Sequence, residues 1–238
     1  MIVNADVKNL EGCTFASLAE DPVMIKEITE KEDLHSNNER DFGLPSRLVA
    51  KRFLFKLIYG ATAYGFYTDP DFLFMGYSEK QWQEVVDTFY KKYQGGHKWH
   101  TKIIQEAQTN GRLTIPSGRY FPFSPERRYN GELKWPITQI KNYPVQGFGA
   151  DLVMLARLEA SKRIRKQNTD AKLISTVHDS IVADCRSEDV VTVGRILYES
   201  IASVPQLCQQ VWGYKLLVPL TSEVQYGPNK KDMKDLEL

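Results

Sequence analysis

The clearest β-strand signal in the chain is the stretch Lys172-Leu-Ile-Ser-Thr-Val177, His178-Asp179-Ser180, Ile181-Val-Ala-Asp-Cys185. Apolar and β-branched residues on both sides of a short polar sequence are typical of a β-hairpin with a tight turn. The two strands would fix the position of Asp179 in that turn. A carboxylate held in this way is a good metal ligand, although Asp in a hairpin turn is equally common as ordinary turn chemistry.

The other segments place this hairpin among helices and strands. Residues 2–7 alternate like a short strand, Pro45-Ser46 opens a helix, and Ser78 with Gln81 forms a capping box that opens another. We expect helices at about 47–59, 78–93, 97–109, 138–166 and 187–203, strands within 112–135 and at 216–225, a polar turn at 36–43, and helix breaks at Gly60 and Gly95-Gly96. This order indicates an α+β fold with a small, mainly antiparallel sheet.

The composition is that of an ordinary globular domain, with 238 residues of which 42% are hydrophobic and 26% charged. No apolar run approaches the roughly 18 residues of a membrane helix, and the first residues do not resemble a secretion signal. We therefore expect a cytoplasmic protein. Because Cys13, Cys185 and Cys208 are odd in number and far apart, we interpret them as reduced core thiols.

The net charge of +1 is a cancellation between an acidic start and a basic middle. Residues 1–41 carry ten Asp and Glu against four Lys and Arg, whereas residues 91–141 carry three Glu against ten Lys and Arg. Two solvated surfaces of opposite sign would explain this pattern, and so would a nucleic-acid-binding segment in the basic part.

Two further patterns could carry chemistry. Asp6 stands at the end of the first strand, where a carboxylate can bind a divalent cation or simply form a turn. Arg47, Lys51, Phe55 and Tyr59 follow one another at intervals of four and therefore share one stripe of a helix. Such a stripe can clamp a triphosphate with two cations while a ring packs on the sugar, or it can be a solvated helix edge beside the core.

His97 and His100 lie three apart on an expected helix, a spacing compatible with a metal pair, but no third ligand is evident nearby. We interpret them as surface histidines.

The three main patterns together resemble motifs A, B and C of the family A (Pol I-like) DNA polymerases. Motif A corresponds to Asp6-Val-Lys-Asn-Leu-Glu11, motif B to Arg47 through Tyr59-Gly60, and motif C to Val177-His178-Asp179. The likeness extends to Asp33-Leu-His35 and to Asn142-Tyr-Pro-Val-Gln146-Gly147, so it spans nearly the whole chain in the family's order.

The resemblance implies a polymerase palm with a small antiparallel sheet, a helical fingers subdomain and no thumb. It assigns residues 1–25 and 111–238 to the palm and 26–110 to the fingers. Asp6, Asp179 and the Val7 carbonyl would hold two Mg²⁺ ions for nucleotidyl transfer from a dNTP to a primer 3′-hydroxyl.

The same resemblance implies roles for the stripe and its surroundings. Arg47, Lys51 and His35 would grip the triphosphate, and Lys51 would also donate a proton to pyrophosphate. Phe55 would pack on the deoxyribose, Tyr59 would stack near the templating base, and Glu11 would exclude a ribose 2′-hydroxyl.

Primer and template would be contacted by Asn142, Gln146 and His178, according to the resemblance. The arginines of 112–128, among them Arg119 and Arg127, fit contacts to the DNA backbone.

Two departures from the family leave alternatives open. Motif C has Ser180 where the family usually has Glu, and motif A has Val7-Lys8 where an aromatic residue and Ser are common. One hypothesis is the catalytic module of a split, phage-type enzyme, with a partner chain that carries the thumb, the missing palm strands and in some cases an exonuclease. Without that partner chain, the hypothesis expects an unpaired edge on the strand of Asp6, and a homo-oligomer that covers this edge is the other possibility. The other is a non-catalytic, polymerase-derived DNA-binding or scaffold subunit of a replication complex.

Overall fold

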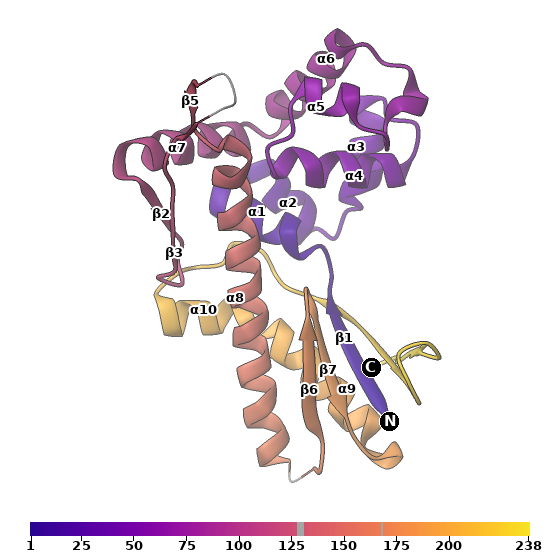
Figure 1. The fold of residues 1–238 in the computed structure, drawn as a ribbon. Helices are drawn as coiled ribbons and strands as arrows, with labels where there is room; N and C mark the ends of the chain where they lie inside the picture. Colours follow the sequence, from indigo (N-terminus) through magenta and orange to yellow (C-terminus); the bar gives the residue numbers. More distant parts are fainter. Residues whose placement is uncertain (128–130, 168) are drawn as a thin grey trace. The chain divides into compact units, whose positions relative to one another are not determined.

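The computed structural model describes residues 1–127, 131–167 and 169–238, which form two compact units (Figure 1). The sheet unit consists of Met1–Leu10 and Gly147–Leu238, and the helical unit consists of Glu11–Gln146. Arg128 lies outside the described residues. These boundaries follow backbone proximity, whereas the palm and fingers division at 25/26 and 110/111 is a functional one that stays a prediction.

The sheet unit is built on an antiparallel sheet of five strands in the order β6-β7-β1-β8-β9. The strands are β1 (Ile2–Val7), β6 (Lys172–Val177), β7 (Ser180–Asp184), β8 (Ser222–Gly227) and β9 (Lys234–Asp235). Along β1 the side chains of Val3, Ala5 and Val7 are buried, and the alternate ones are half-buried. The alternation that predicts this strand therefore marks the face turned to the core.

β1 lies in the middle of this sheet, with β7 on one side and β8 on the other. The expectation of an unpaired edge on the strand of Asp6 is therefore wrong. Residues 222–227, at the far end of the chain, fill that edge over the whole length of β1. The geometry of this strand gives no support to a missing neighbouring strand.

The helices of the sheet unit include most of α8 (Ile137–Lys166), which begins in the helical unit. After the β6–β7 hairpin come η2 (Ser187–Asp189), α9 (Val190–Ala202) and α10 (Val204–Trp212). α9 packs on β1 and β8. The helices expected at 138–166 and 187–203 are thus confirmed, but of the strand expected at 216–225 only residues 222–225 lie in a strand.

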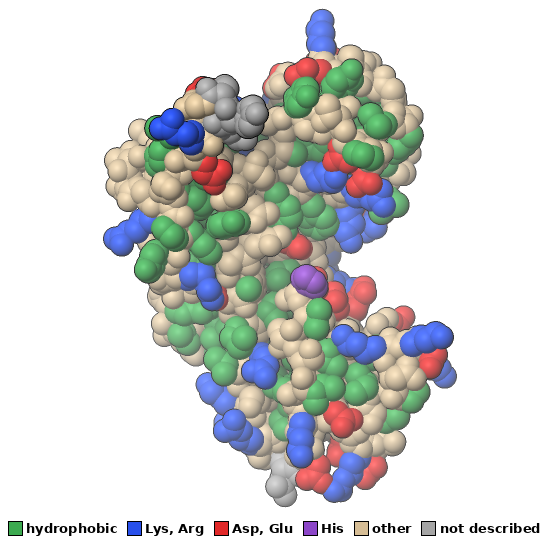
Figure 2. Space-filling model, in the orientation of Figure 1, with side chains coloured by type: hydrophobic (Ala, Val, Ile, Leu, Met, Phe, Trp, Pro, Cys, Tyr) green, Lys and Arg blue, Asp and Glu red, His purple; other side chains and the backbone are tan. Residues whose placement is uncertain are grey.

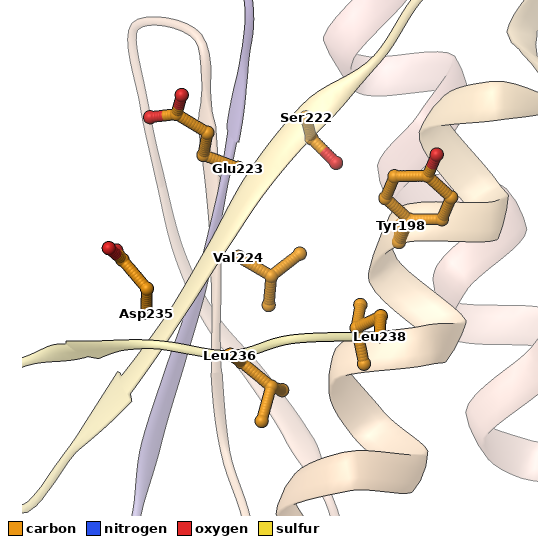
Figure 3. Close-up of a pocket in the computed structure, with 7 residues that line it drawn as sticks. All are labelled: Tyr198, Ser222, Glu223, Val224, Asp235, Leu236 and Leu238. Atoms are coloured by element: carbon orange, nitrogen blue, oxygen red, sulfur yellow. The ribbon is translucent and has the colours of Figure 1, made fainter.

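The last residues of the chain return along β8 and enclose a hollow of about 360 Å³ (Figure 3). The Leu236 N–H donates a hydrogen bond of 2.8 Å to the Val224 carbonyl and continues the β8–β9 pairing. The hollow is lined by Tyr198, Ser222, Glu223, Val224, Asp235, Leu236 and Leu238. In Figure 3 the Ser222 and Val224 side chains point toward α9, whereas Glu223 points to the other side of β8.

The helical unit contains the helices α1 (Leu10–Ala19), α2 (Pro22–Thr29), α3 (Leu34–Phe42), α4 (Arg47–Ile58), α5 (Ala63–Thr68), η1 (Leu73–Met75), α6 (Glu79–Lys92) and α7 (Gln94–Asn110). Its short strands are β2 (Arg112–Thr114), β3 (Tyr120–Pro122), β4 (Glu126–Arg127) and β5 (Leu133–Lys134). Phe53, Phe66, Trp82 and Phe89 form an aromatic core between α4, α5 and α6. Ser78 and Gln81 form the predicted capping box of α6, with both reciprocal hydrogen bonds present.

Three expectations for the helical unit are wrong. Residues 36–43 form most of helix α3 rather than a turn. Gly95 and Gly96 lie inside the first turn of α7 instead of breaking the chain between helices. His100, interpreted as a surface residue, is 2% exposed, because α7 turns it toward α4 and α6.

All three cysteines are free and buried, as the sequence indicates. Within the described ranges, the structure contains no helix of the length and apolarity that a membrane span requires.

Candidate functional site

The two aspartates predicted to bind metal come together in the sheet unit. Asp6 is paired with Ser180, the first residue of β7, and Asp179 immediately precedes it in the turn. The Val7 N–H donates a hydrogen bond of 3.0 Å to the backbone carbonyl of Asp179. β1 and β7 are therefore the neighbouring strands that the prediction requires, and both aspartates lie at the same end of the pair.

The turn that presents Asp179 consists of two residues. His178 adopts a positive φ of 55°, a conformation unusual for a residue with a side chain, and this lets β6 reverse directly into β7. The His178 side chain is exposed and the Asp179 side chain is half-buried. The hairpin thus fixes the carboxylate at a rigid tip.

The donor set at this tip fits Mg²⁺. Carboxylate oxygens from Asp6 and Asp179 and a backbone carbonyl from Val7 are the hard oxygen ligands that Mg²⁺ prefers, and this ion keeps several waters or phosphate oxygens as well. Among the described residues there is no group of three or more His, Cys, Asp or Glu side chains able to hold a metal ion. Asp6 and Asp179 are thus two candidate ligands that do not form a complete metal site by themselves.

Ser180, which stands where the family usually has a carboxylate, closes the turn. Its side chain is buried, and its hydroxyl donates a hydrogen bond of 3.0 Å to the Val177 carbonyl. The residue therefore stabilises the hairpin that carries Asp179.

Besides Asp6 and Asp179, a third carboxylate lies at this end of the sheet, and the sequence patterns do not identify it. Glu223 on β8 is paired with Asp6 on the side away from Ser180, so the two side chains share a face of the sheet. The Glu223 carboxylate forms an ion pair of 2.9 Å with the Lys8 ammonium, which comes two residues after Asp6. Only the strand register, which depends on pairing across more than two hundred residues, could have identified it.

A cationic cluster in the helical unit contains most of the predicted triphosphate-binding residues. Arg47, Lys51 and Phe55 occupy successive turns of α4, and His35 on α3 packs against Phe55 with ring centroids 5.8 Å apart. The Lys51 ammonium lies 5.7 Å from the centre of the Phe55 ring. Both cations of this cluster come from α4, and the ring of His35 joins them from α3. On the face shown in Figure 2, Lys and Arg side chains are mixed with Asp and Glu, so charge alone does not distinguish a site there.

The electrostatics of the cluster favour an anion. Burial, together with the positive charges of Arg47 and Lys51, lowers the pKa of His35 to about 4. Its Nδ1 atom is buried and has no hydrogen-bond partner among the described residues. His35 is therefore neutral at pH 7 and adds no positive charge to that of Arg47 and Lys51. Because its Nδ1 atom has almost no exposed surface, a ligand would have to approach the other ring nitrogen.

The two remaining residues predicted to contact the nucleotide lie at the ends of helices. Tyr59 follows α4 as its C-terminal cap, one turn after Phe55, and is half-buried. Glu11 lies in the first turn of α1.

The predicted DNA contacts are distributed over both units. Asn142 and Gln146 lie one turn apart on α8, so they share one side of that helix, and Gln146 is exposed. Arg119 immediately precedes β3 and Arg127 lies in β4, and both side chains are exposed. In the neighbouring β2–β3 hairpin, the Arg112 guanidinium lies 5.9 Å from the centre of the Tyr120 ring.

Comparison with known proteins supports the resemblance. The family described as DNA polymerase family A matches residues 1–232. DNA polymerase I of Aquifex aeolicus (strain VF5) is 28% identical over 98% of this chain and 39% of its own length. DNA polymerase I of Geobacillus stearothermophilus is 27% identical over 98% of this chain and 26% of its own length.

Among solved structures, the chain is similar to the POL domain of Pol1 from M. smegmatis in complex with DNA primer-template and dNTP. The TM-score is 0.79 at 21% identity, over 95% of this chain and 39% of that one. This likeness shows the fold. The chain thus spans about a quarter to two-fifths of the length of the proteins it matches.

Proposed function

Because the chain belongs to DNA polymerase family A, we propose that it is the catalytic module of a template-directed DNA polymerase. The observation that carries this proposal is the pairing of β1 with β7, which brings Asp6 and Asp179 to one end of the same sheet. Two carboxylates held close together on neighbouring strands could bind the two metal ions that this type of nucleotidyl transfer uses.

The proposed reaction joins a primer 3′-oxygen to the α-phosphate of a dNTP and releases pyrophosphate. Asp6, Asp179 and the Val7 carbonyl would hold two Mg²⁺ ions. Bound there, the ions would favour the attacking alkoxide and neutralise charge on the leaving group. Lys51 would donate a proton to the departing pyrophosphate.

The cationic cluster would bind the nucleotide. Arg47 and Lys51 supply charge, and the single ring N–H of the neutral His35 would donate a hydrogen bond to a phosphate oxygen. Phe55 would pack on the deoxyribose, Tyr59 near the templating base, and Glu11 against a 2′-hydroxyl.

Primer-template DNA is the proposed macromolecular ligand. The M. smegmatis Pol1 domain is described in complex with DNA primer-template and dNTP, which supports both ligands here. Asn142, Gln146 and His178 would contact primer or template, and Arg119 and Arg127 the phosphate backbone.

We further propose that the chain works with a thumb supplied by another polypeptide or another segment, as in a phage-type split enzyme. A partner chain could also carry an exonuclease. The sheet itself adds no support, because β1 is paired on both sides.

Primer extension tests the catalytic proposal. We expect Mg²⁺-dependent extension by the chain mixed with a thumb-containing fragment of a relative, and a loss of at least about a hundredfold in rate for Asp179→Asn. The matched control is Asp184→Asn, which removes a carboxylate from the other end of the hairpin strand and should extend primers at the wild-type rate.

The alternative is a non-catalytic DNA-binding or scaffold subunit. Ser180, in the place of the usual carboxylate, is the observation that favours it. If wild type and Asp179→Asn bind primer-template equally well and neither extends it, the scaffold role replaces the catalytic one.

A further inference from the structure

Arg47, the first cation of the cluster, is already bound to a carboxylate in the structure. Its Nε lies 2.6 Å from Asp33 Oδ2, across the gap between α4 and the start of α3. The ion pair raises the pKa of Arg47 and holds the pKa of Asp33 far below its usual range. The guanidinium that would grip a phosphate thus has an anionic partner from the protein itself.

Asp33 does not depend on Arg47 for its position. It is the N-cap of α3, where Oδ1 accepts hydrogen bonds from the His35 N–H at 3.1 Å and the Ser36 N–H at 3.3 Å. Its Oδ2 also accepts one of 2.9 Å from the Ser36 hydroxyl. If Arg47 left, three donors would remain on a carboxylate that is 44% exposed, so no unsatisfied charge would be buried.

We propose that Asp33 sets the affinity of the cluster for a triphosphate, because it occupies Arg47 in the empty site and exchanges it for phosphate when the ligand binds. The inference rests on the proposed nucleotide-binding function of this cluster. Asp33 is not a catalytic residue here, since it acts through Arg47.

Two effects both predict that removing the charge of Asp33 strengthens triphosphate binding. Exposed ion pairs are weak, so breaking this one costs roughly two- to fivefold in an equilibrium constant. A triphosphate beside Asp33 also meets a like charge, which opposes binding at low salt. The competing idea, that Asp33 only orients Arg47, predicts the opposite sign, because losing the orientation would weaken binding.

Calorimetric titration of the chain with inorganic tripolyphosphate distinguishes the two ideas. Asp33→Asn keeps an efficient N-cap and removes the charge. We expect it to lower the Kd for tripolyphosphate by about three- to tenfold at low salt, with a smaller gain as salt is added. An unchanged or higher Kd, in a variant with the helix content of wild type by circular dichroism, would overturn the inference.

Two variants test whether the effect passes through Arg47. When Arg47 is already replaced by Ala, Asp33→Asn should lower log Kd by less than half of the amount that it does in the wild-type background. An equal decrease would overturn the inference, because the effect would then come from the lost negative charge alone and not from the release of Arg47. Asp71→Asn is the matched control, because it removes a carboxylate that pairs with Arg52 and Lys56 on the same helix, while Lys56 keeps Asp69 as a partner. It should leave the Kd unchanged, and a gain equal to that of Asp33→Asn would again overturn the inference.

The experiment also separates this inference from the proposed function. If wild type binds tripolyphosphate and Arg47→Ala weakens binding while Asp33→Asn changes nothing, only the exchange role of Asp33 fails. If neither wild type nor Asp33→Asn binds tripolyphosphate, the cluster is not a phosphate site and both proposals fail.

Discussion

The His100 ring connects three helices of the helical unit. Its Nε2 lies 3.2 Å from the Ile58 carbonyl at the end of α4, and its Nδ1 lies 3.0 Å from the Tyr90 hydroxyl on α6. Because a carbonyl can only accept, Nε2 carries the proton and Nδ1 accepts from Tyr90. The neutral ring satisfies both partners, and burial lowers its pKa well below the usual value.

This arrangement predicts a loss of stability in mild acid. The unfolded chain takes up a proton on His100 near pH 6.5, whereas the folded chain resists it, so the free energy of unfolding should fall as the pH drops below about 6.5. His100→Gln should lower stability at pH 7.5 by about 1–3 kcal/mol and flatten the decline between pH 6.5 and 5. Urea unfolding at a series of pH values measures both.

His97→Gln is the control for this prediction, since His97 is exposed one turn earlier on α7. It should keep the wild-type pH dependence. An acid-induced decline of full size in His100→Gln would show that other groups cause it; His35 is the next to examine, because its pKa is lowered to about 4.

At the scale of elements, Gly95 and Gly96 allow two helices to approach closely. A Cβ on Gly95 would lie 2.6 Å from the Asp21 Cα atom, and the Gly96 N–H donates a hydrogen bond of 3.1 Å to Asp21 Oδ2. Asp21 is also the N-cap of α2. The sequence pattern predicts a chain break at these glycines, but Gly95 instead lets the backbone of Asp21 lie against the first turn of α7.

Gly95→Ala should therefore destabilise the protein by about 1–3 kcal/mol, because backbone cannot move aside as a flexible side chain can. This loss should appear although Ala favours a helix over Gly by about 1 kcal/mol. Gly65→Ala in α5 is the matched control, since the nearest atom to its Cβ would be Thr62 Oγ1 at 3.6 Å. Equal thermal midpoints for the two variants would contradict the close-approach argument.

Most elements could be predicted from local patterns, and the exceptions have physical reasons. Helix α3 lacks an apolar stripe because half of its buried face is polar, namely His35 and Asn38. Asn38 accepts hydrogen bonds from Lys92 and Tyr93, which come from more than fifty residues away. No local pattern can show that such a face is buried.

In the candidate site, too, some residues can be predicted from local patterns and others only from the packing of distant segments. Asp6, Asp179 and the α4 stripe can be identified because their spacing is local or matches a family motif. Glu223 beside Asp6 cannot, because a strand register places it. Asp33 belongs to a stretch that resembles the family, but its ion pair with Arg47 depends on the packing of α3 on α4 and cannot be predicted either.

At the scale of the whole molecule, the near-zero net charge conceals a basic segment at residues 91–141. We expect Arg119→Glu combined with Arg127→Glu to weaken primer-template binding. The slope of log K against log salt should also become shallower by about 0.9 for each DNA phosphate that the protein no longer neutralises. Fluorescence anisotropy at several salt concentrations measures both quantities.

The double variant Lys26→Glu and Lys31→Glu changes the net charge by the same amount from exposed positions in the acidic segment. It should leave the slope unchanged. If the arginine variant also keeps the wild-type slope, these arginines do not bind DNA phosphates.

The central place of β1 also determines the order in which the molecule can fold. Residues 2–7 pair with residues 180–184 and 222–227, so the sheet depends on pairing between very distant parts of the chain. Non-local pairing of this kind is slow, whereas residues 11–146 form a compact unit from one continuous segment. During synthesis on a ribosome the helical unit can form first. Asp6 then acquires its β-sheet neighbours only after nearly all of the chain has been made.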